Sequence, residues 1–248
     1  MRRTAIVTGG SRGIGAAAAR LLAAQGWDVA VVFHAAAAAA ADVVAECTAA
    51  GAAAIAVQAD VASEPDVVRL FETVDARLGS LAALVNNAGI VSAAHRVDQL
   101  TAEAVERMFA VNAIGPFLCA REAVRRMSTR HGGTGGAIVN VSTSAVRHGS
   151  PGEYVDYAAA KGAVDVMTIG LAREVAAEGV RVNAVRPGLV LTDIHASGGR
   201  PDRPAELAPQ IPMRRAGDPE EIANAIAWLC SDEASYVTGA LLDVSGGR

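Results

Sequence analysis

Residues 4–26 read TAIVTGGSRGIGAAAARLLAAQG, and this stretch determines the first unit of the fold. A short β-branched run leads into a glycine-rich turn, and an alanine- and leucine-rich segment then continues to Gly26. The pattern predicts a strand over 4–10 and a helix over 14–26 that Gly26 caps. Short apolar runs alternate with longer helical segments along the rest of the chain, so the same unit is repeated.

The remaining elements follow from the same alternation of patterns. Further strands are predicted at 28–34, 53–60, 81–89, 136–144, 180–188 and 239–247. Further helices are predicted at 35–51, 64–78, 101–127, 153–177 and 218–231. Strands that are apolar throughout are typical of a parallel sheet with helices on both faces. We therefore expect one α/β domain over 1–248, a doubly wound parallel Rossmann sheet of about seven strands.

One segment does not fit this alternation. Residues 193–215 are rich in Gly, Pro and Arg and show no clean periodicity. Irregular connections of this length are uncommon in compact domains unless they have a function. We expect the segment to be a lid or binding loop over the substrate.

Composition narrows the class of protein. Hydrophobic residues make up 52% of the 248 residues and aromatic residues only 4%, so the core must be built from Ala, Val, Leu and Ile. A net charge of −4 without a basic run argues against nucleic acid as the main partner. The start MRRTAIVTGG has no long apolar stretch after its two arginines, so we expect neither a signal peptide nor a membrane anchor. Cys47, Cys119 and Cys230 show no metal-binding spacing, which predicts buried free thiols and a cytoplasmic protein.

The glycine turn TGGSRGIG (8–15) is typical of a phosphate-binding turn. Gly9, Gly13 and Gly15 let the backbone turn tightly and approach a pyrophosphate, and the helix N-terminus offers free N–H groups to that anion. The spacing differs from the commoner GxGxxG, and a simple strand–helix turn is the alternative. Its position at the start of the first βαβ unit favours dinucleotide binding.

The end of the second strand indicates which dinucleotide binds. An acidic residue there would bind the ribose 2′-hydroxyl of NAD, but the strand ends VFHAAA with His34 and no acid. Arg12, inside the glycine turn, is suited to a 2′-phosphate. Both features favour NADP over NAD, with a simply solvated Arg12 as the alternative.

The segment YVDYAAAK (154–161) contains the only lysine of the chain and two of its three tyrosines. Tyr157 and Lys161 are four residues apart, so on a helix they share a face, whereas Tyr154 is about 10.5 Å along the axis from Lys161. A nearby ammonium lowers the pKa of a phenol. Tyr157 is therefore the predicted acid/base, and an ordinary packing pair on a surface helix is the alternative.

Several motifs together resemble one family. TGGSRGIG, NNAG (86–89), Asn112, Ser144, YAAAK (157–161) and RPG (186–188) resemble the short-chain dehydrogenase/reductase family, in its order and spacing from residue 4 to the C-terminus. The second half most resembles sugar-dehydrogenase-like and ketoreductase-like members. The resemblance implies that Tyr157 transfers the proton and Lys161 tunes it, while Ser144 positions the substrate oxygen and Asn112 completes a proton relay. Ser142 and Thr143 also offer hydroxyl groups beside Ser144.

The resemblance also implies a set of cofactor contacts. In it, Asp60 accepts from the adenine amino group, Lys161 reaches the nicotinamide ribose, and Thr192 and the Val190 backbone hold the carboxamide. An acid near a helix N-cap is the alternative for Asp60. The implied contacts are Gly9, Ser11, Arg12, Gly13, Ile14, Gly15, His34, Asp60, Val61, Asn87, Ala88, Gly89, Tyr157, Lys161, Pro187, Gly188, Val190 and Thr192.

The histidines are not expected to form a metal site. His34, His95, His131, His148 and His195 share no metal-ligand spacing. His148 and His195 are expected to be ordinary residues, with a place in the substrate pocket as the alternative. No metal is implied, because Tyr157 and Lys161 supply the polarisation that a Lewis acid would provide.

The predicted function is an NADP(H)-dependent oxidoreductase acting on a small-molecule carbonyl or secondary alcohol. The alternatives are an NAD-dependent sugar or alcohol dehydrogenase, a nucleotide-sensing regulator without turnover, and another nucleotide-using Rossmann enzyme such as a methyltransferase. The small and apolar surfaces of the helices 101–127 and 153–177 and the apolar last strand also predict a homotetramer, in keeping with the resemblance, with a monomer as the alternative. The helix positions expected to face outward are Ala163, Val166, Met167 and Gly170.

Overall fold

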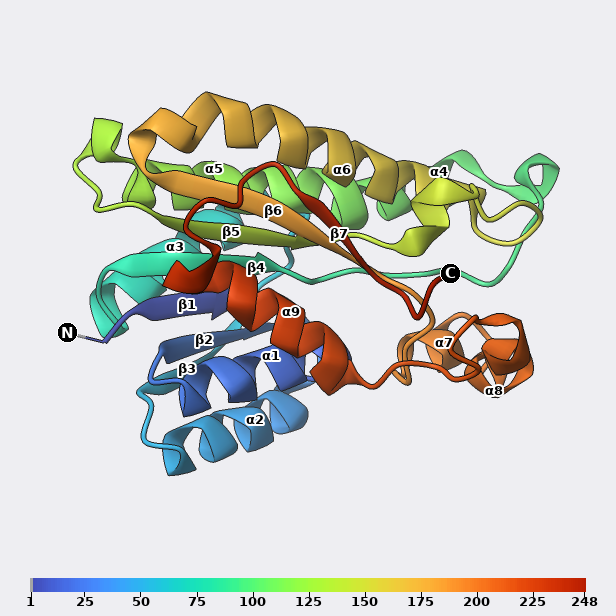
Figure 1. Cartoon of the computed structure of the whole chain (residues 1–248), viewed down its shortest axis with the longest axis horizontal. Coiled ribbons are helices and arrows are strands. Elements are labelled where there is room, and N and C mark those ends of the chain that lie inside the picture. The colour runs from blue at the N-terminus through green and yellow to red at the C-terminus, as the bar shows by residue number, and fades with distance from the viewer. Residues whose placement is uncertain (1) are drawn as a thin grey trace.

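Seven parallel strands form a single sheet in the computed structural model, which describes residues 2–248. The strand order is β3-β2-β1-β4-β5-β6-β7, so β7 is an edge strand as expected (Figure 1). The strands are β1 Thr4–Val7, β2 Asp28–Phe33, β3 Ala54–Gln58, β4 Leu81–Asn86, β5 Gly136–Val141, β6 Val180–Pro187 and β7 Leu241–Val244. The prediction of a doubly wound sheet of seven strands is confirmed.

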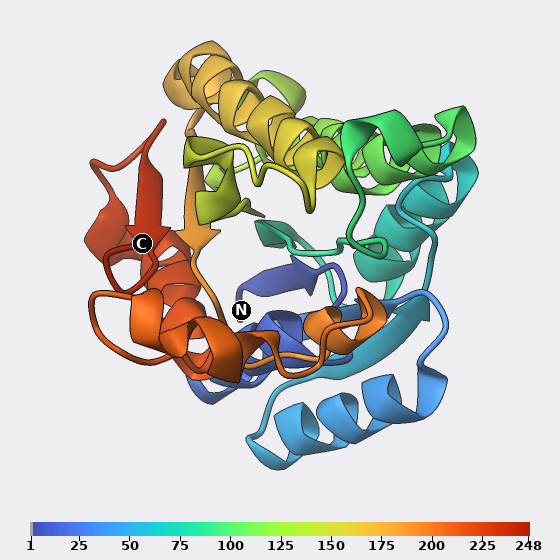
Figure 2. The same cartoon turned by 90° about the vertical axis from the view of Figure 1, so that its right-hand side faces the viewer.

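Helices cover both faces of this sheet (Figure 2). One face carries α1 Gly13–Ala24, α2 Ala37–Ala49 and α9 Pro219–Cys230. The other carries α3 Glu64–Arg77, α4 Ala102–Phe109, α5 Gly115–Met127 and α6 Val155–Val175. The three layers bury an aliphatic core, as the low aromatic content predicts.

The alternation of side chains in β1 explains why its sequence is apolar throughout. Ala5 and Val7 pack with α1 and α9, whereas Ile6 lies in the core on the opposite face with residues of α3 and α5. Successive side chains of a strand point to opposite faces, so both sets must be apolar when both faces are covered.

The sheet order reverses between β1 and β4, and this reversal positions the site. Val7 of β1 pairs with Val31 of β2 on one side and with Val85 of β4 on the other. Ligands of open α/β sheets bind beyond the carboxyl ends of the strands at such a reversal. The short helices α7 Ile194–Ser197 and α8 Arg203–Leu207 lie at this same end of the sheet (Figure 1).

The single helix predicted over 101–127 is wrong, because a π-helical turn interrupts it. Residues Ala110–Ile114 form that turn between α4 and α5, with Asn112 at its centre. Pro116 has no N–H, so the carbonyl of Asn112 four residues earlier cannot receive an α-helical hydrogen bond from it. A wider turn of this kind inside a helix is frequent at functional sites.

The segment predicted to be irregular at 193–215 contains some regular structure. Besides α7 and α8, Ala208–Gln210 forms a 3-10 turn, and prolines occupy the first turns of α8 and of this turn.

On α6, Val166 and Gly170 are exposed as expected but Met167 is buried, so Met167 does not belong to the outer surface. Among residues 2–248, no helix has both the length and the apolar character needed to cross a bilayer.

Candidate functional site

A cavity of about 430 Å³ lies beyond the carboxyl ends of the strands. It brings together the glycine turn, the segment after β4, the start of α6 and the segment after β6. The predicted site residues that line it are Gly9, Ser11, Arg12, Gly13, Ile14, His34, Asp60, Val61, Asn87, Ala88, Gly89, Ser144, Tyr157, Lys161, Pro187, Gly188, Val190 and Thr192. Gly15 and Asn112 lie behind this lining and do not form part of it.

The glycine turn forms a close-packed cradle at the start of α1. Gly9 and Gly13 have φ angles of +62° and +53°, which L side chains rarely adopt. A Cβ atom at Gly15 would lie 2.3 Å from the Gly9 carbonyl oxygen and 2.5 Å from Asn87 Nδ2. Larger side chains would therefore push α1 away from the turn. The residues present fit a pyrophosphate held by the N-terminus of α1.

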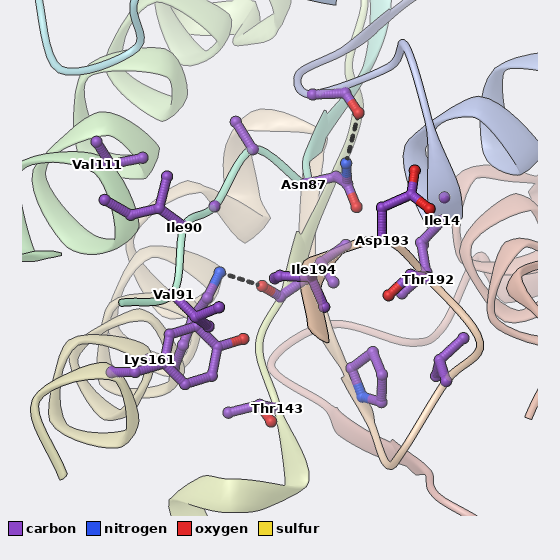
Figure 3. Close-up of a pocket in the computed structure, with 18 of the residues that line it drawn as sticks. Ile14, Asn87, Ile90, Val91, Val111, Thr143, Lys161, Thr192, Asp193 and Ile194 are labelled. Atoms are coloured by element: carbon purple, nitrogen blue, oxygen red, sulfur yellow. Dashed lines mark hydrogen bonds between the residues drawn. The ribbon is translucent and has the colours of Figure 1, made fainter. Parts of the chain in front are cut away.

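Asn87 ties the turn to the segment after β4 (Figure 3). Its Nδ2 donates to the carbonyl oxygens of Thr8 at 2.9 Å and Gly9 at 3.1 Å. The Thr8 hydroxyl in turn accepts from the backbone N–H groups of Asn87 and Ala88. These bonds fix the two walls of the crevice relative to each other.

The adenosine end of the crevice contains a charge cluster that the sequence analysis only partly predicted. Asp60 Oδ2 pairs with Arg107 at 3.1 Å and lies 3.9 Å from His34 Nε2. Asp60 Oδ1 accepts from the backbone N–H of Ala62. Arg12 lines the same region, is exposed, and precedes α1 directly. Arg12, His34 and Arg107 thus line this part of the cavity, and no acidic residue follows β2 directly in the sequence.

Tyr157 and Lys161 lie one turn apart at the start of α6 and share the cavity wall, whereas Tyr154 precedes the helix. Lys161 is buried, and its Nζ donates a 2.8 Å hydrogen bond to the carbonyl oxygen of Val141 at the end of β5. Burial lowers the pKa of Lys161 to about 8, although the nearby charge of Asp165 opposes this shift. The lysine is therefore close to its titration range at physiological pH.

The expectation that Lys161 lowers the pKa of Tyr157 is wrong for the protein chain by itself. Lys161 Nζ lies 6.0 Å from the centroid of the Tyr157 ring, and its hydrogen bond goes to Val141. Burial instead raises the pKa of Tyr157 to about 12, against smaller lowering effects of the Thr143 hydrogen bond and the Arg203 charge. The phenol is thus protonated at neutral pH, which is the acid form.

Thr143, one position before the predicted Ser144, is the hydroxyl residue whose hydrogen bond lowers the pKa of Tyr157. Its side chain lies near Lys161 in the cavity (Figure 3). Thr143 caps the 3-10 turn Ser144–Arg147, and its Oγ1 accepts from the backbone N–H of Ala145. Ser144 is buried and lines the cavity. Ser142 donates to the backbone carbonyl of Lys161 at 3.4 Å. The hydroxyl groups of Ser142, Thr143 and Ser144, among which the sequence did not choose, therefore have different surroundings in the structure.

Asn112 is fully buried and fastens the π turn to the segment after β4. Its Oδ1 accepts from the Ile90 N–H at 3.1 Å, and its Nδ2 donates to the carbonyl oxygens of Ile90 and Met108. A Cβ added to Gly89 would lie 2.8 Å from Asn112 Oδ1 and 3.5 Å from Lys161 Nζ. Asn112 thus lies close behind the wall that carries Lys161.

The remaining wall comes from the 148–154 segment, α7, α8 and the C-terminal residue. His148 and His195 both line the cavity, so the alternative interpretation of these two histidines holds. Burial lowers the pKa of each imidazole. Arg203 and Arg248 also line this end, and neither was predicted as a site residue. No motif marks Arg107, Arg203 or Arg248, because their partners are far away in the sequence.

Comparisons with known proteins find relatives over nearly the whole chain. A family model described as enoyl-(acyl carrier protein) reductase matches residues 9–248. An uncharacterized oxidoreductase of Escherichia coli, YgfF, is 55% identical over 98% of this chain and 99% of that protein. Cis-4-hydroxycyclohexanecarboxylate dehydrogenase of Sinomonas cyclohexanicum is 42% identical over 99% of this chain and 96% of that protein. The solved structure of a mutant Serratia marcescens short-chain dehydrogenase/reductase superposes with a TM-score of 0.91 at 34% identity, covering 99% of this chain and 97% of that one.

Proposed function

This chain belongs to the short-chain dehydrogenase/reductase family, and from that premise we propose that it is an NADP(H)-dependent reductase of a carbonyl compound, or dehydrogenase of the corresponding secondary alcohol. One observation carries the proposal. Tyr157, Thr143 and Lys161 occupy one wall of the cavity whose other end is the glycine cradle. The cavity, of about 430 Å³, thus has room for a reacting group between a dinucleotide and a proton donor.

The protein would supply the proton from Tyr157. The half-buried phenol, with a pKa of about 12, carries its proton at neutral pH and is ready to give it to a carbonyl oxygen as that oxygen gains charge. When bound, the nicotinamide supplies or accepts the hydride. In the opposite direction the phenolate is required, which the burial of Tyr157 disfavours. The protonated phenol is the form that carbonyl reduction needs at neutral pH.

Thr143 would hold the substrate oxygen together with Tyr157. Its side chain is a hydrogen-bond partner of the phenol, and both residues line the cavity. A second donor at the developing oxyanion stabilises the transition state more than the ground state. Ser144, the residue that the resemblance implies, lines the same cavity and is the alternative for this role.

The cofactor would be NADP, with NAD as the alternative. Arg12 and His34 border the crevice after β2, where an acid would be needed to bind the 2′-hydroxyl of NAD. Guanidinium groups recognise phosphate by paired charge-assisted hydrogen bonds. Asp60 would then face the adenine, with Arg107 holding its carboxylate in place at 3.1 Å.

Lys161 and Asn112 would act behind the proton donor. Lys161 is held by Val141 with its ammonium on the cavity wall, where it would meet the ribose hydroxyls of the dinucleotide. Asn112 positions the π turn and the segment that carries Gly89 and Ile90. The segment with α7 and α8 would be the lid, because its residues line the cavity from Asp193, beside the glycine turn (Figure 3), to Arg203.

We further propose a cytoplasmic homotetramer. Ile114 and Phe117 are each 51% exposed and Val166 is 72% exposed, and these apolar side chains belong to the neighbouring π turn, α5 and α6. Burial of such a surface against a second copy is favourable. The edge strand β7 supplies a second surface for association. The three cysteines are free and buried, which suits a reducing compartment.

Oxidation of NADPH across a panel of ketones and aldehydes tests the proposal. Turnover of at least one carbonyl class, with NADPH preferred over NADH, is the expected result. Preference for NADH would favour the alternative of an NAD-dependent dehydrogenase. Binding of the dinucleotide without turnover of any carbonyl or alcohol would reject the oxidoreductase and favour a nucleotide-sensing protein.

A further inference from the structure

Two arginines line the end of the cavity that lies away from the glycine turn. Arg203 belongs to α8 and Arg248 follows β7, and both border the cavity together with Tyr154 and His148. We propose that these arginines bind a carboxylate group of the substrate, so that the substrate is an oxo acid or the matching hydroxy acid. The inference rests on the proposed function and names the substrate class of the same site.

Arg203 is fixed and nearly buried. Its side chain is 12% exposed, its guanidinium carbon lies 5.2 Å from the centroid of the Tyr154 ring, and one terminal nitrogen donates to Glu153 at 2.7 Å. Its Nε atom is buried without a hydrogen-bond partner among residues 2–248. A buried charged group with an unused donor is costly, so this arginine can gain from an additional acceptor.

Arg248 has no acidic side chain as a partner. Within the described residues it forms no ion pair, although it is partly buried. Its main-chain oxygen accepts from the hydroxyl of Ser245 at 2.9 Å, which fixes the residue at the cavity. Burial and the nearby charge of Arg203 lower the pKa of its guanidinium, in keeping with two like charges that lie near each other.

The neighbouring acids do not neutralise this group. Glu153 accepts from both Arg200 and Arg203, and Glu206 pairs with the second terminal nitrogen of Arg200. The two carboxylate side chains thus pair with Arg200 and Arg203, and neither of them pairs with Arg248. The guanidinium of Arg248 is the one of the three without an ion pair among residues 2–248, so a ligand can supply its partner.

The acids that do line the cavity lie elsewhere. Asp60 pairs with Arg107 at the adenosine end. Asp193 lies beside Ile14 and Thr192, apart from Thr143 (Figure 3). Arg203, by contrast, lies near the catalytic wall. Its charge offsets part of the rise that burial causes in the pKa of Tyr157. Arg203 therefore lies at the end of the cavity next to the proton donor, where the substrate must lie.

A carboxylate is the group that fits two guanidinium side chains. Arginine binds carboxylates through parallel hydrogen bonds of fixed geometry, and such bonds are strong where water is excluded. A neutral carbonyl compound would leave Arg248 without a partner next to Arg203. The protein should therefore prefer a carbonyl compound with a carboxylate over the same compound with that charge removed.

Matched substrates test the inference. We would measure kcat/KM with NADPH for straight-chain and cyclic oxo acids of increasing distance between carbonyl and carboxylate, and for the methyl ester of each. The wild type should favour at least one acid over its ester by about tenfold or more, and Arg248→Gln should remove most of that preference. Arg248→Lys should retain part of it. Arg77→Gln, which removes an exposed arginine at the end of α3, is the matched control and should keep the wild-type ratio.

Esters that are reduced as well as or better than their acids would overturn the inference but leave the reductase intact. An unchanged acid-to-ester ratio in Arg248→Gln would also overturn it. If no carbonyl compound is reduced, the proposed function is rejected. A separate binding measurement then tests whether the arginines bind a carboxylate. With NADPH present, hexanoate should raise the melting temperature of the wild type, and hexanamide should not. No rise, an equal rise in Arg248→Gln, or a larger rise with hexyl phosphate would contradict a carboxylate site.

Discussion

Lys161 Nζ lies 6.0 Å from the centroid of the Tyr157 ring and donates its hydrogen bond to the carbonyl oxygen of Val141. The pair shares a helix face as the four-residue spacing predicts, but the ammonium is bound to β5 and not to the phenol. The two pKa shifts are both consequences of burial, upward for Tyr157 and downward for Lys161.

The lowered pKa of Lys161 predicts how stability changes with pH. Between about pH 8 and the unfolded value near 10.5, the unfolded chain binds more protons than the folded one, so the free energy of unfolding rises with pH. The buried charge costs about 3 kcal/mol below this window. We predict that the wild type gains stability relative to Lys161→Met between pH 7 and pH 10. Urea unfolding of both proteins at the two pH values measures this, and a constant difference would show that Lys161 is not perturbed.

The contact between Thr143 and Tyr157 predicts which hydroxyl group supports turnover. Thr143→Ala should lower kcat by about 10²-fold, because a donor to the developing oxyanion is lost. Thr143→Ser should restore most of the activity. Steady-state kinetics of both, with Ser144→Ala as the comparison, would assign the role. A dead Ser144→Ala with an active Thr143→Ala would return the role to Ser144.

The cluster at the end of β2 predicts the choice of dinucleotide. Arg12→Ala should raise the dissociation constant of NADPH by about tenfold or more and change that of NADH little, because only the 2′-phosphate is lost as a partner. Fluorescence titration of the two cofactors measures both constants. Equal losses for NADPH and NADH would mean that Arg12 does not contact the 2′-phosphate.

The exposed apolar surface predicts the state of assembly. Light scattering coupled to size exclusion should give a mass near four times the 25.2 kDa chain at micromolar concentration. Val166→Glu places a charge on that surface and should reduce the mass, because an unpaired charge is costly to bury. Deletion of the last eight residues should also reduce it if β7 belongs to an interface. A single species at 25.2 kDa in the wild type would exclude the tetramer.

The sequence predicted the sheet because its signals are local. A parallel strand buried on both faces is an apolar run, and each such run in this chain is followed by a turn and a helix. Predicted strand ends ran past the actual ones. The segment 4–10, for example, gave β1 only to Val7, because the backbone turns at Gly9 with a positive φ angle.

The pattern of residues does not predict the π turn or the arginines of the cavity, for a different reason. Ala and Val dominate the segment around Asn112, so helix propensity continues through it and hides the break before Pro116. Arg107, Arg203 and Arg248 are brought to the cavity only by the packing of distant segments. The contact of Tyr157 with Thr143 depends on the 3-10 turn after β5, which spacing along the chain does not reveal.

The central claim is that Tyr157 gives its proton to the substrate. The most direct measurement is the NADPH-dependent reduction of the best carbonyl substrate by Tyr157→Phe and Tyr154→Phe, with NADPH binding measured for both. Tyr157→Phe should lose turnover by about 10²-fold or more and still bind NADPH, because only the titrating hydroxyl is removed. Tyr154→Phe keeps the ring that packs against Arg203 and should retain most of its activity. An active Tyr157→Phe alongside an inactive Tyr154→Phe would contradict the account.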